Sequence, residues 1–258
     1  MLLVHRTLLV SLLMSLAFLS ASCAIRPTDP DELADFLETN DPLEPFNRKV
    51  FAFNQAVDEN FLVPLAKGYR FIMPAEFRQS IRHFTNNLRE PYNFANNLLQ
   101  LSPDTPKTLA RFFINSTIGF FGLLDVASEL GLEYDDEDFG QTLAVWGVPE
   151  GPYLVLPFLG SSNPRDAFGT IVGIVSDPVS IALGGAGLQI INYSLTGLNV
   201  IGLREAFLDP LEQIKANSLD YYATMRSLYR QRREKQIHDF DPADRVIKPI
   251  WRDQYDHR

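Results

Sequence analysis

Apolar residues recur at helical intervals along much of the chain. The first stripe repeats at spacings of three and four residues and consists of Phe46, Val50, Phe53 and Val57. The segment just before it, 41–44 (DPLE), supplies a cap residue, a proline at the first helical position and an acid in the first turn. The pattern therefore predicts that a helix, and with it the folded part of the chain, begins at Asp41.

The same periodicity predicts further short helices downstream. Residues 76–100 carry an apolar stripe that is interrupted at Pro91 and then resumes, so a break in the helix is expected there. Prolines at positions 103 and 106 restart a helix whose apolar residues are Leu109, Phe112, Phe113 and Phe120. Residues 209–237 return to helix with apolar positions set among charges. Short helices dominate the first half of the chain.

Two stretches depart from the helical pattern. Residues 153–156 (YLVL) predict a short strand with no obvious partner. Residues 131–139 (GLEYDDEDF) hold the densest acidic cluster, and they predict a solvated loop because they lack the alternating ligands and distal glutamate of a calcium loop. The sequence after His238 is polar, which predicts a mobile tail over 238–258.

Residues 178–203 contain no formal charge and are long enough for a membrane span. Five glycines and several amide side chains lower both helix propensity and hydrophobicity, which favours two shorter helices that meet near Asn192. Three interpretations stay open. The segment is the buried core of a folded domain, a bilayer span, or a stretch that lies in one leaflet or lines a cavity.

Composition narrows the class of function. A hydrophobic content of 46% and a charged content of 21% are typical of an ordinary folded protein. Lys and Arg number 23 against 32 Asp and Glu, and the resulting net charge of −9 repels nucleic acid, so no nucleic-acid partner is expected. A single cysteine supports neither an intrachain disulfide nor a thiolate zinc cluster.

That single cysteine follows a secretion signal. Residues 1–22 open with Arg6, continue through an apolar run too short for a stable span, and end in small residues before Cys23. The arrangement resembles a bacterial lipobox, whose cysteine thiol is acylated, although Ser20 stands where a branched apolar residue is usual. The alternative is a plain signal peptide followed by a stray thiol. Residues 23–40, which are acidic and contain two prolines, are expected to be a flexible, lipidated tether.

No set of residues predicts catalysis. The chain has no Gly-x-Ser-x-Gly elbow, and His83, His238 and His257 have no metal-binding spacing. His83 lies in a helical stripe, where a surface histidine is the expected interpretation. The glycine run 184–187 lacks a preceding strand and a phosphate-binding lysine. Neither an enzyme nor a bound metal or cofactor is expected.

Several blocks of sequence resemble the MlaA family, also called VacJ, of outer-membrane lipoproteins for phospholipid transport. Their collinear order covers about 41–180 and makes the resemblance specific, whereas the match beyond 180 is loose. The blocks are DPLEPFNRKVFAFN (41–54), FTNNLREPYNFANNLLQ (84–100), RFFINSTIGFFGLLDVA (111–127), FGQTLAVWGVPEGPYLVLPFLG (139–160) and NPRDAFG (163–169).

The resemblance implies the all-α fold class, with a compact, ring-like or wedge-like helical domain over 41–237 that is embedded in the periplasmic leaflet of a Gram-negative outer membrane. Proteins of this family sit beside trimeric porins, offer phospholipids a polar channel and pass them to a soluble periplasmic carrier. The implied function is the removal of phospholipids misplaced in the outer leaflet, which maintains lipid asymmetry. The alternative is a structural or adaptor lipoprotein that binds porins without conducting lipid.

The resemblance also implies roles for particular residues. Cys23 is the acylated residue. The first block is the part of the family thought to help gate the channel, and it contributes Asp41, Pro42, Phe46, Asn47 and Asn54. The residues expected to face the leaflet or the core are Phe112, Phe113, Phe120 and Phe121. Arg165 and Asp166 are expected to form a local ion pair without a transport role.

Replacing the cysteine tests the lipid anchor. Cys23→Ser is expected to abolish labelling by a radioactive or clickable fatty acid and to move the protein into the soluble periplasmic fraction, because two or three acyl chains contribute roughly 0.8 kcal/mol per buried methylene. Continued tight membrane binding of the unlabelled variant would instead mean that the helices themselves insert deeply.

Overall fold

The computed structural model describes residues 39–238, and the predicted all-α fold is confirmed. The signal segment 1–22, Cys23, the predicted tether up to residue 38 and the tail 239–258 lie outside the described residues. The elements in chain order are α3 (Glu44–Val57), η2 (Asp58–Leu62), α4 (Val63–Ile72), α5 (Ala75–Leu99), α6 (Thr105–Thr117), α7 (Val126–Glu129), α8 (Phe139–Val145), β1 (Leu154–Leu156), β2 (Gly160–Ser162), α9 (Pro164–Ser176), α10 (Pro178–Gly185), α11 (Gln189–Ala206), α12 (Leu208–Asn217) and α13 (Tyr221–His238).

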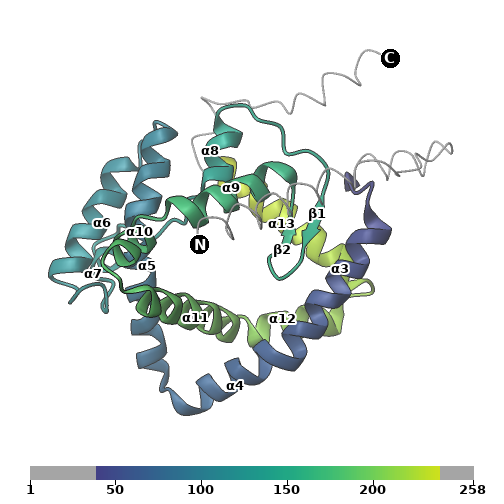
Figure 1. Cartoon of the computed structure of the whole chain (residues 1–258), viewed down its shortest axis with the longest axis horizontal. Coiled ribbons are helices and arrows are strands. Elements are labelled where there is room, and N and C mark those ends of the chain that lie inside the picture. The colour runs from purple at the N-terminus through teal and green to yellow at the C-terminus, as the bar shows by residue number, and fades with distance from the viewer. Residues whose placement is uncertain (1–38, 239–258) are drawn as a thin grey trace.

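The helices form a ring (Figure 1). α3 and α4 run along one side, α5 turns onto the next side with α6 packed against it, and α8 and α9 cross the top. α11 returns along α4 and contacts α5, and α12 leads into α13, which packs against α8 and β2. The ring-like arrangement implied by the family resemblance is therefore present.

Three helix boundaries differ from those expected. α3 begins at Glu44 rather than Asp41, because the Asp41 side chain is buried in contacts with other elements and does not cap the helix. α5 continues through Pro91, where packing of α6 along the helix overrides the missing backbone donor. The helix that carries Phe112 ends at Thr117, so Phe120 lies in the following turn with a φ of +51°.

The second half of the chain also differs from expectation. The uncharged segment breaks at Gly187 rather than near Asn192, because the φ of +76° at Gly187 ends the helical path. Residues 209–237 form two helices, α12 and α13, rather than one. The strand β1 has a partner after all, since it pairs antiparallel with β2, whose sequence GSS carries no strand signal.

Polar side chains occupy much of the interior of this fold, and many large apolar side chains are exposed on its surface. Phe71 is 92% exposed and Leu101 is 81% exposed, whereas the cluster of buried hydrophobic residues is small and consists of Tyr153, Val155 and Tyr222. The largest fully buried side chains are Arg111, Gln100, Gln141, Glu90, Asn47, Asn93, Asn97 and Thr142. This distribution is the reverse of that in soluble helical proteins.

The buried charges between α5, α6 and α7 satisfy one another. Arg111 donates from Nε to Glu90 at 2.7 Å and from Nη2 to Asp125 at 3.1 Å. Asp125 also accepts from the amide of Asn115 at 2.9 Å and caps α7 through the Ser128 N–H. Burial nevertheless raises the pKa of Glu90 to about 7, against the opposing effect of Arg111. The ionised form of Glu90 therefore depends on its ion pair with Arg111.

Part of the acidic loop is buried, contrary to the expectation of a solvated loop. Glu137 accepts from the Gln100 amide at 2.9 Å, and burial raises the pKa of Glu137 to about 7. Asp138 caps α8 and forms an ion pair with Arg233 at 2.6 Å. Burial by itself would raise the pKa of Asp138, but the hydrogen bonds and the positive charge of Arg233 outweigh it and lower this pKa to about 2. Among the described residues no group of His, Cys, Asp or Glu is placed to hold a metal ion.

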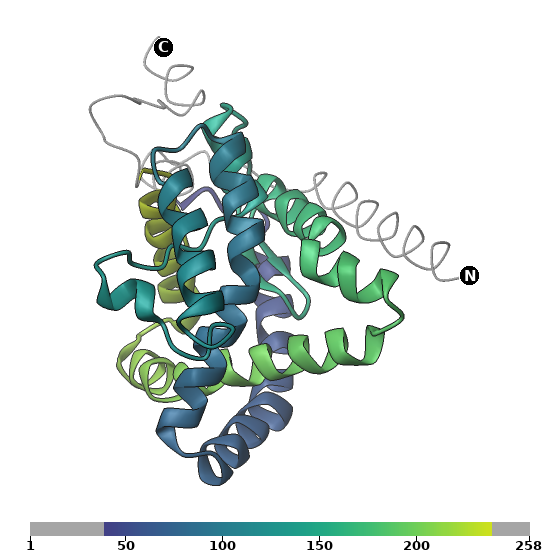
Figure 2. The same ribbon diagram turned by 90° about the vertical axis from the view of Figure 1, so that its left-hand side faces the viewer.

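The uncharged segment 178–203 does not form a core, so that interpretation is wrong. Gly202 is its only buried residue, and Figure 2 shows α10 and the start of α11, in green, projecting from the body of the ring. The described part of the chain contains one helical stretch, Pro164–Gly185, that is apolar and long enough to cross a membrane, although Asp177 interrupts it between α9 and α10. Only 6% of its most apolar window is buried.

Removing the arginine tests the polar interior. Arg111→Ala leaves Glu90 buried without its cation, so we expect it to lower the free energy of unfolding by about 3–5 kcal/mol, measured by thermal unfolding in detergent. The double variant with Glu90→Gln is expected to recover part of this loss. Arg232→Ala, which removes an exposed guanidinium, is the control and should change stability by less than about 0.5 kcal/mol. A small effect of Arg111→Ala on stability would contradict the dependence of the buried Glu90 carboxylate on Arg111.

Candidate functional site

Two asparagines of the first block, 41–54, which is the signature of the family, hold the β-hairpin of β1 and β2 against α3. Asn47 is fully buried; its amide nitrogen donates to the Tyr153 carbonyl at 3.0 Å, and its amide oxygen accepts from the Val155 N–H at 3.0 Å. Asn54, two turns further along α3, donates to the Leu156 carbonyl at 2.9 Å and accepts from the Phe158 N–H at 2.8 Å. The signature helix therefore fixes the position of the hairpin.

Asp41 joins the beginning of the described chain to its last helix. Its carboxylate accepts from the Asn47 amide at 2.8 Å, from Arg226 at 2.7 Å and from the hydroxyl of Tyr222. Burial and the Asp41 carboxylate raise the pKa of Tyr222 well above its usual range, so its hydroxyl remains a donor. The ring closes through this contact.

A second cluster holds the other end of α13. Asp166 accepts from Arg165 at 2.9 Å, from Arg233 at 2.9 Å and from the hydroxyl of Tyr229 at 2.6 Å. The two arginines help to keep the pKa of Asp166 below its usual range in spite of burial. The expected Arg165–Asp166 pair is present, and it is part of a cluster between α9 and α13 rather than a local contact alone.

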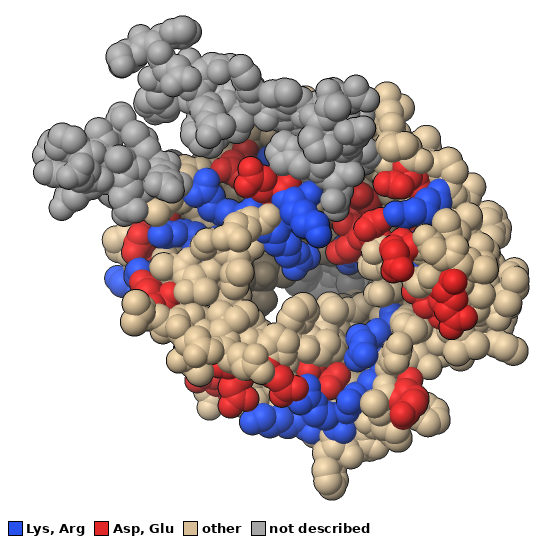
Figure 3. Space-filling view, turned by 180° about the vertical axis from the view of Figure 1, so that it is seen from behind, with Lys and Arg blue, Asp and Glu red and all other residues tan. Residues whose placement is uncertain are grey.

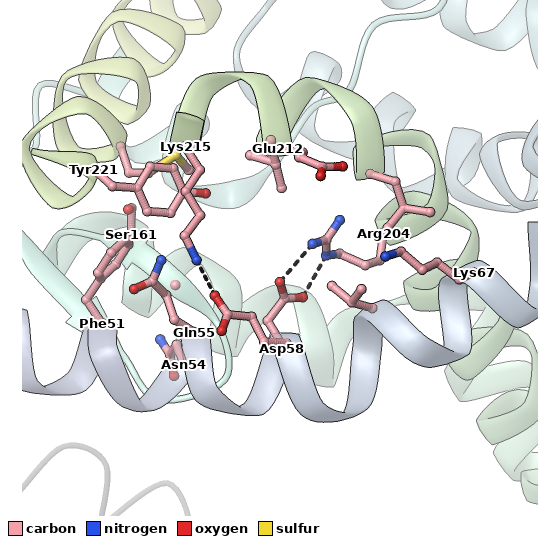
Figure 4. A pocket seen from close by; sticks show the side chains of 16 residues that line it. Phe51, Asn54, Gln55, Asp58, Lys67, Ser161, Arg204, Glu212, Lys215 and Tyr221 are labelled. Carbon is pink, nitrogen blue, oxygen red and sulfur yellow. Dashed lines mark hydrogen bonds and ion pairs between the residues drawn. The ribbon is translucent and has the colours of Figure 1, made fainter. Parts of the chain in front are cut away.

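A cavity of about 410 Å³ opens between the α3–η2–α4 side and the α11–α12 side of the ring (Figure 4). Asn54 of the signature lines it, and Gly160 and Ser161 of the hairpin contribute to its wall. Its apolar lining includes Phe51, Val63, Leu208, Leu211, Tyr221 and Met225. Its charged lining consists of Asp58, Glu59, Lys67, Arg204, Glu212 and Lys215.

Two ion pairs cross this cavity from a π-helical turn. η2 carries Asp58 and Glu59, and such turns occur frequently at functional sites. Asp58 accepts from Arg204 at 2.6 and 2.8 Å, and Glu59 pairs with Lys215 (Figure 4). The hydrogen bonds to these carboxylates raise the pKa of Arg204 and the pKa of Lys215, so both cations stay charged at physiological pH.

The other predicted site residues lie outside this cavity. Phe46 is exposed and Pro42 is half-buried. Phe113, Phe120 and Phe121 are exposed, the last to 77%. The remaining aromatic residue of that prediction, Phe112, is half-buried and packs edge-on against Phe113 with ring centroids 5.7 Å apart.

Sequence reasoning missed the α11–α12 wall of the cavity. Arg204 lies 146 positions from Asp58, and Lys215 lies 156 positions from Glu59. Both cations lie beyond the sequence blocks that carry the family resemblance in the sequence analysis, although the family model reported below includes them. Their only local signal was the return of charge after the long uncharged segment.

The space-filling view in Figure 3 shows the molecule hollowed at the centre of the ring, with basic side chains near the hollow. Fold and site together define a class: an all-α ring protein with a polar interior, an apolar surface and a cavity lined by charges. A family model described as MlaA lipoprotein matches residues 39–236. The chain belongs to the MlaA lipoprotein family.

Relatives from several bacteria support this membership. The chain is 30% identical over 239 residues to the intermembrane phospholipid transport system lipoprotein MlaA of Haemophilus influenzae, covering 91% of each chain. It is 32% identical over 222 residues to the protein of the same name in Escherichia coli K12, covering 81% of each. An uncharacterized protein of Rickettsia bellii is 40% identical over 206 residues, covering 78% of each.

A solved structure has the same fold. It comes from work on the "structural basis for maintenance of bacterial outer membrane lipid asymmetry", and it is 33% identical to this chain with a TM-score of 0.63. The match covers 76% of this chain and 98% of that chain.

Proposed function

We propose that this protein carries phospholipids through its helical ring without catalysing a chemical reaction. It takes phospholipid misplaced in the outer leaflet of the outer membrane and passes it to a soluble periplasmic carrier, which maintains lipid asymmetry. The observation that carries the proposal is the reversed distribution of polarity around a hollow ring. The transport role named for the relatives in Haemophilus influenzae and Escherichia coli supports it.

A phospholipid has to move a charged head group and apolar tails along one route. Desolvating a charge without a partner is expensive, so the head group needs polar groups throughout its passage. The interior of the ring and the charged cavity between η2 and α12 offer such groups. The tails stay against apolar side chains, which this molecule has on its surface.

In this proposal the ring lies in the periplasmic leaflet of the membrane, beside a porin trimer, and the exposed apolar surface supports this position. The α10–α11 arm and the exposed phenylalanines of the α6–α7 region supply surface that water disfavours but acyl chains accept. The acyl chains on Cys23 hold the protein at this membrane. Of the interpretations left for residues 178–203, a position within one leaflet fits this arrangement.

Charge on the exposed rings tests this membrane placement. In the Cys23→Ser background, Phe113→Asp and Phe120→Asp are expected to reduce binding to phospholipid vesicles about tenfold or more, because a buried phenylalanine contributes roughly 1.5–3 kcal/mol. Gln213→Asp adds the same charge at an exposed polar position on α12 and should leave binding unchanged. Unchanged vesicle binding by the two folded variants would contradict contact of these exposed rings with lipid.

Cells that lack this protein test the transport role. Phospholipid in the outer leaflet, measured by lipid A palmitoylation or by surface labelling of phospholipid, is expected to rise on deletion and to return to normal when the intact gene is restored. A deletion without any rise would contradict lipid removal. It would favour the adaptor role, in which the protein binds porins without conducting lipid.

A further inference from the structure

The charges that line the cavity balance one another. Three cations stand against three carboxylates, and they are Lys67, Arg204, Lys215, Asp58, Glu59 and Glu212. The cavity therefore carries no formal net charge, although the whole chain carries −9. A ligand without net charge keeps that balance, whereas an anionic ligand adds a negative charge to an already negative protein.

One end of the cavity is suited to a phosphate. The Nη1 atom of Arg204 is buried and has no hydrogen-bond partner, while its Nε and Nη2 atoms bind Asp58. Lys67 lines the cavity together with Arg204 (Figure 4), and no described residue forms an ion pair with Lys67. An unpaired ammonium and an orphaned guanidinium N–H are the donors that a phosphodiester oxygen accepts from.

The other end of the cavity is suited to an ammonium group. Phe51 and Tyr221 lie together there, with ring centroids 5.6 Å apart and planes tilted by 58° (Figure 4). Aromatic faces attract alkylammonium groups. The Glu59–Lys215 pair at this end is half exposed, with side-chain exposures of 53% and 52%, so Glu59 holds its lysine weakly. Its carboxylate is free to exchange Lys215 for a ligand ammonium.

We propose that this cavity selects zwitterionic head groups, in which a phosphodiester carries a short ammonium arm, over anionic ones. The phosphate lies at Lys67 and Arg204. The ammonium group lies against Phe51 and Tyr221 and pairs with Glu59. The apolar residues between the two ends receive the first carbons of the lipid. This inference rests on the proposed function, and it adds a head-group preference to it.

Competition between two lipids tests the selectivity. The full-length, acylated protein in detergent is equilibrated with mixed micelles that contain equal amounts of phosphatidylethanolamine and phosphatidylglycerol, and bound lipids are quantified by mass spectrometry. The wild type is expected to bind the zwitterionic lipid at least about fivefold in excess over the anionic lipid. Equal binding of the two lipids would overturn the selectivity.

Two neutralising variants separate the two ends of the cavity. Glu59→Gln removes the ammonium partner and leaves the cavity with a positive charge, so the ratio of zwitterionic to anionic lipid should fall about fivefold. Lys67→Gln removes a phosphate donor that both lipids use, so total bound lipid should fall about fivefold. The matched controls are Glu76→Gln on α5 and Lys49→Gln on α3, which are exposed residues outside the cavity and should change neither quantity.

The outcomes distinguish this inference from the transport role. A Glu59→Gln variant that keeps the wild-type ratio would overturn the head-group preference and leave lipid transport standing. A wild-type protein that binds neither lipid would overturn both. Since Glu59 and Lys67 are exposed or half-exposed side chains, loss of folding is not the expected result, and thermal unfolding of each variant checks this.

Discussion

Every charge and amide inside this ring needs a partner, and that requirement governs the structure. Arg111 illustrates it: a fully buried guanidinium holds carboxylates from α5 and from the cap of α7 in one cluster. Such contacts are directional, unlike apolar packing, so they determine how the helices lie against one another. The interior therefore consists of specific hydrogen bonds, and the apolar side chains are left for the surface.

The closure of the ring follows the same rule. α13 is fixed at one end to Asp41 through Tyr222 and Arg226, and near the other end to Asp138 and Asp166 through Arg233. Between these ends the hairpin is held by amide groups of α3. The first described helix, the hairpin and the last helix thus form one unit, and a change in any of these polar contacts would affect the opening at the centre.

A polar interior within an apolar surface suits a protein that moves amphiphiles. In the proposed transport, the head group of a phospholipid would meet hydrogen-bonding groups inside the ring, and its tails would meet apolar side chains outside it. In the proposed head-group preference, the cavity at η2 would add discrimination through a phosphate end and an ammonium end. The proposed transport and the proposed preference would then both arise from one distribution of charge.

The sequence alone determined the helical class, the family and the placement of Phe46, Asn47 and Asn54 on a helix, because helical periodicity and collinear blocks are local properties. It also indicated the Arg165–Asp166 pair, whose members are neighbours. It did not indicate that Pro91 lies within a continuous helix, that β1 pairs with GSS, or that Glu137 is buried. Those outcomes depend on contacts with α6, on the turn of the hairpin and on the hydrogen bond from Gln100, in that order. Helical periodicity does not predict such contacts. Only the tertiary structure decided the cavity, because Asp58 and Arg204 become neighbours when α11 returns along α4. The free energy of such a contact depends on both segments together, so neither segment by itself predicts it.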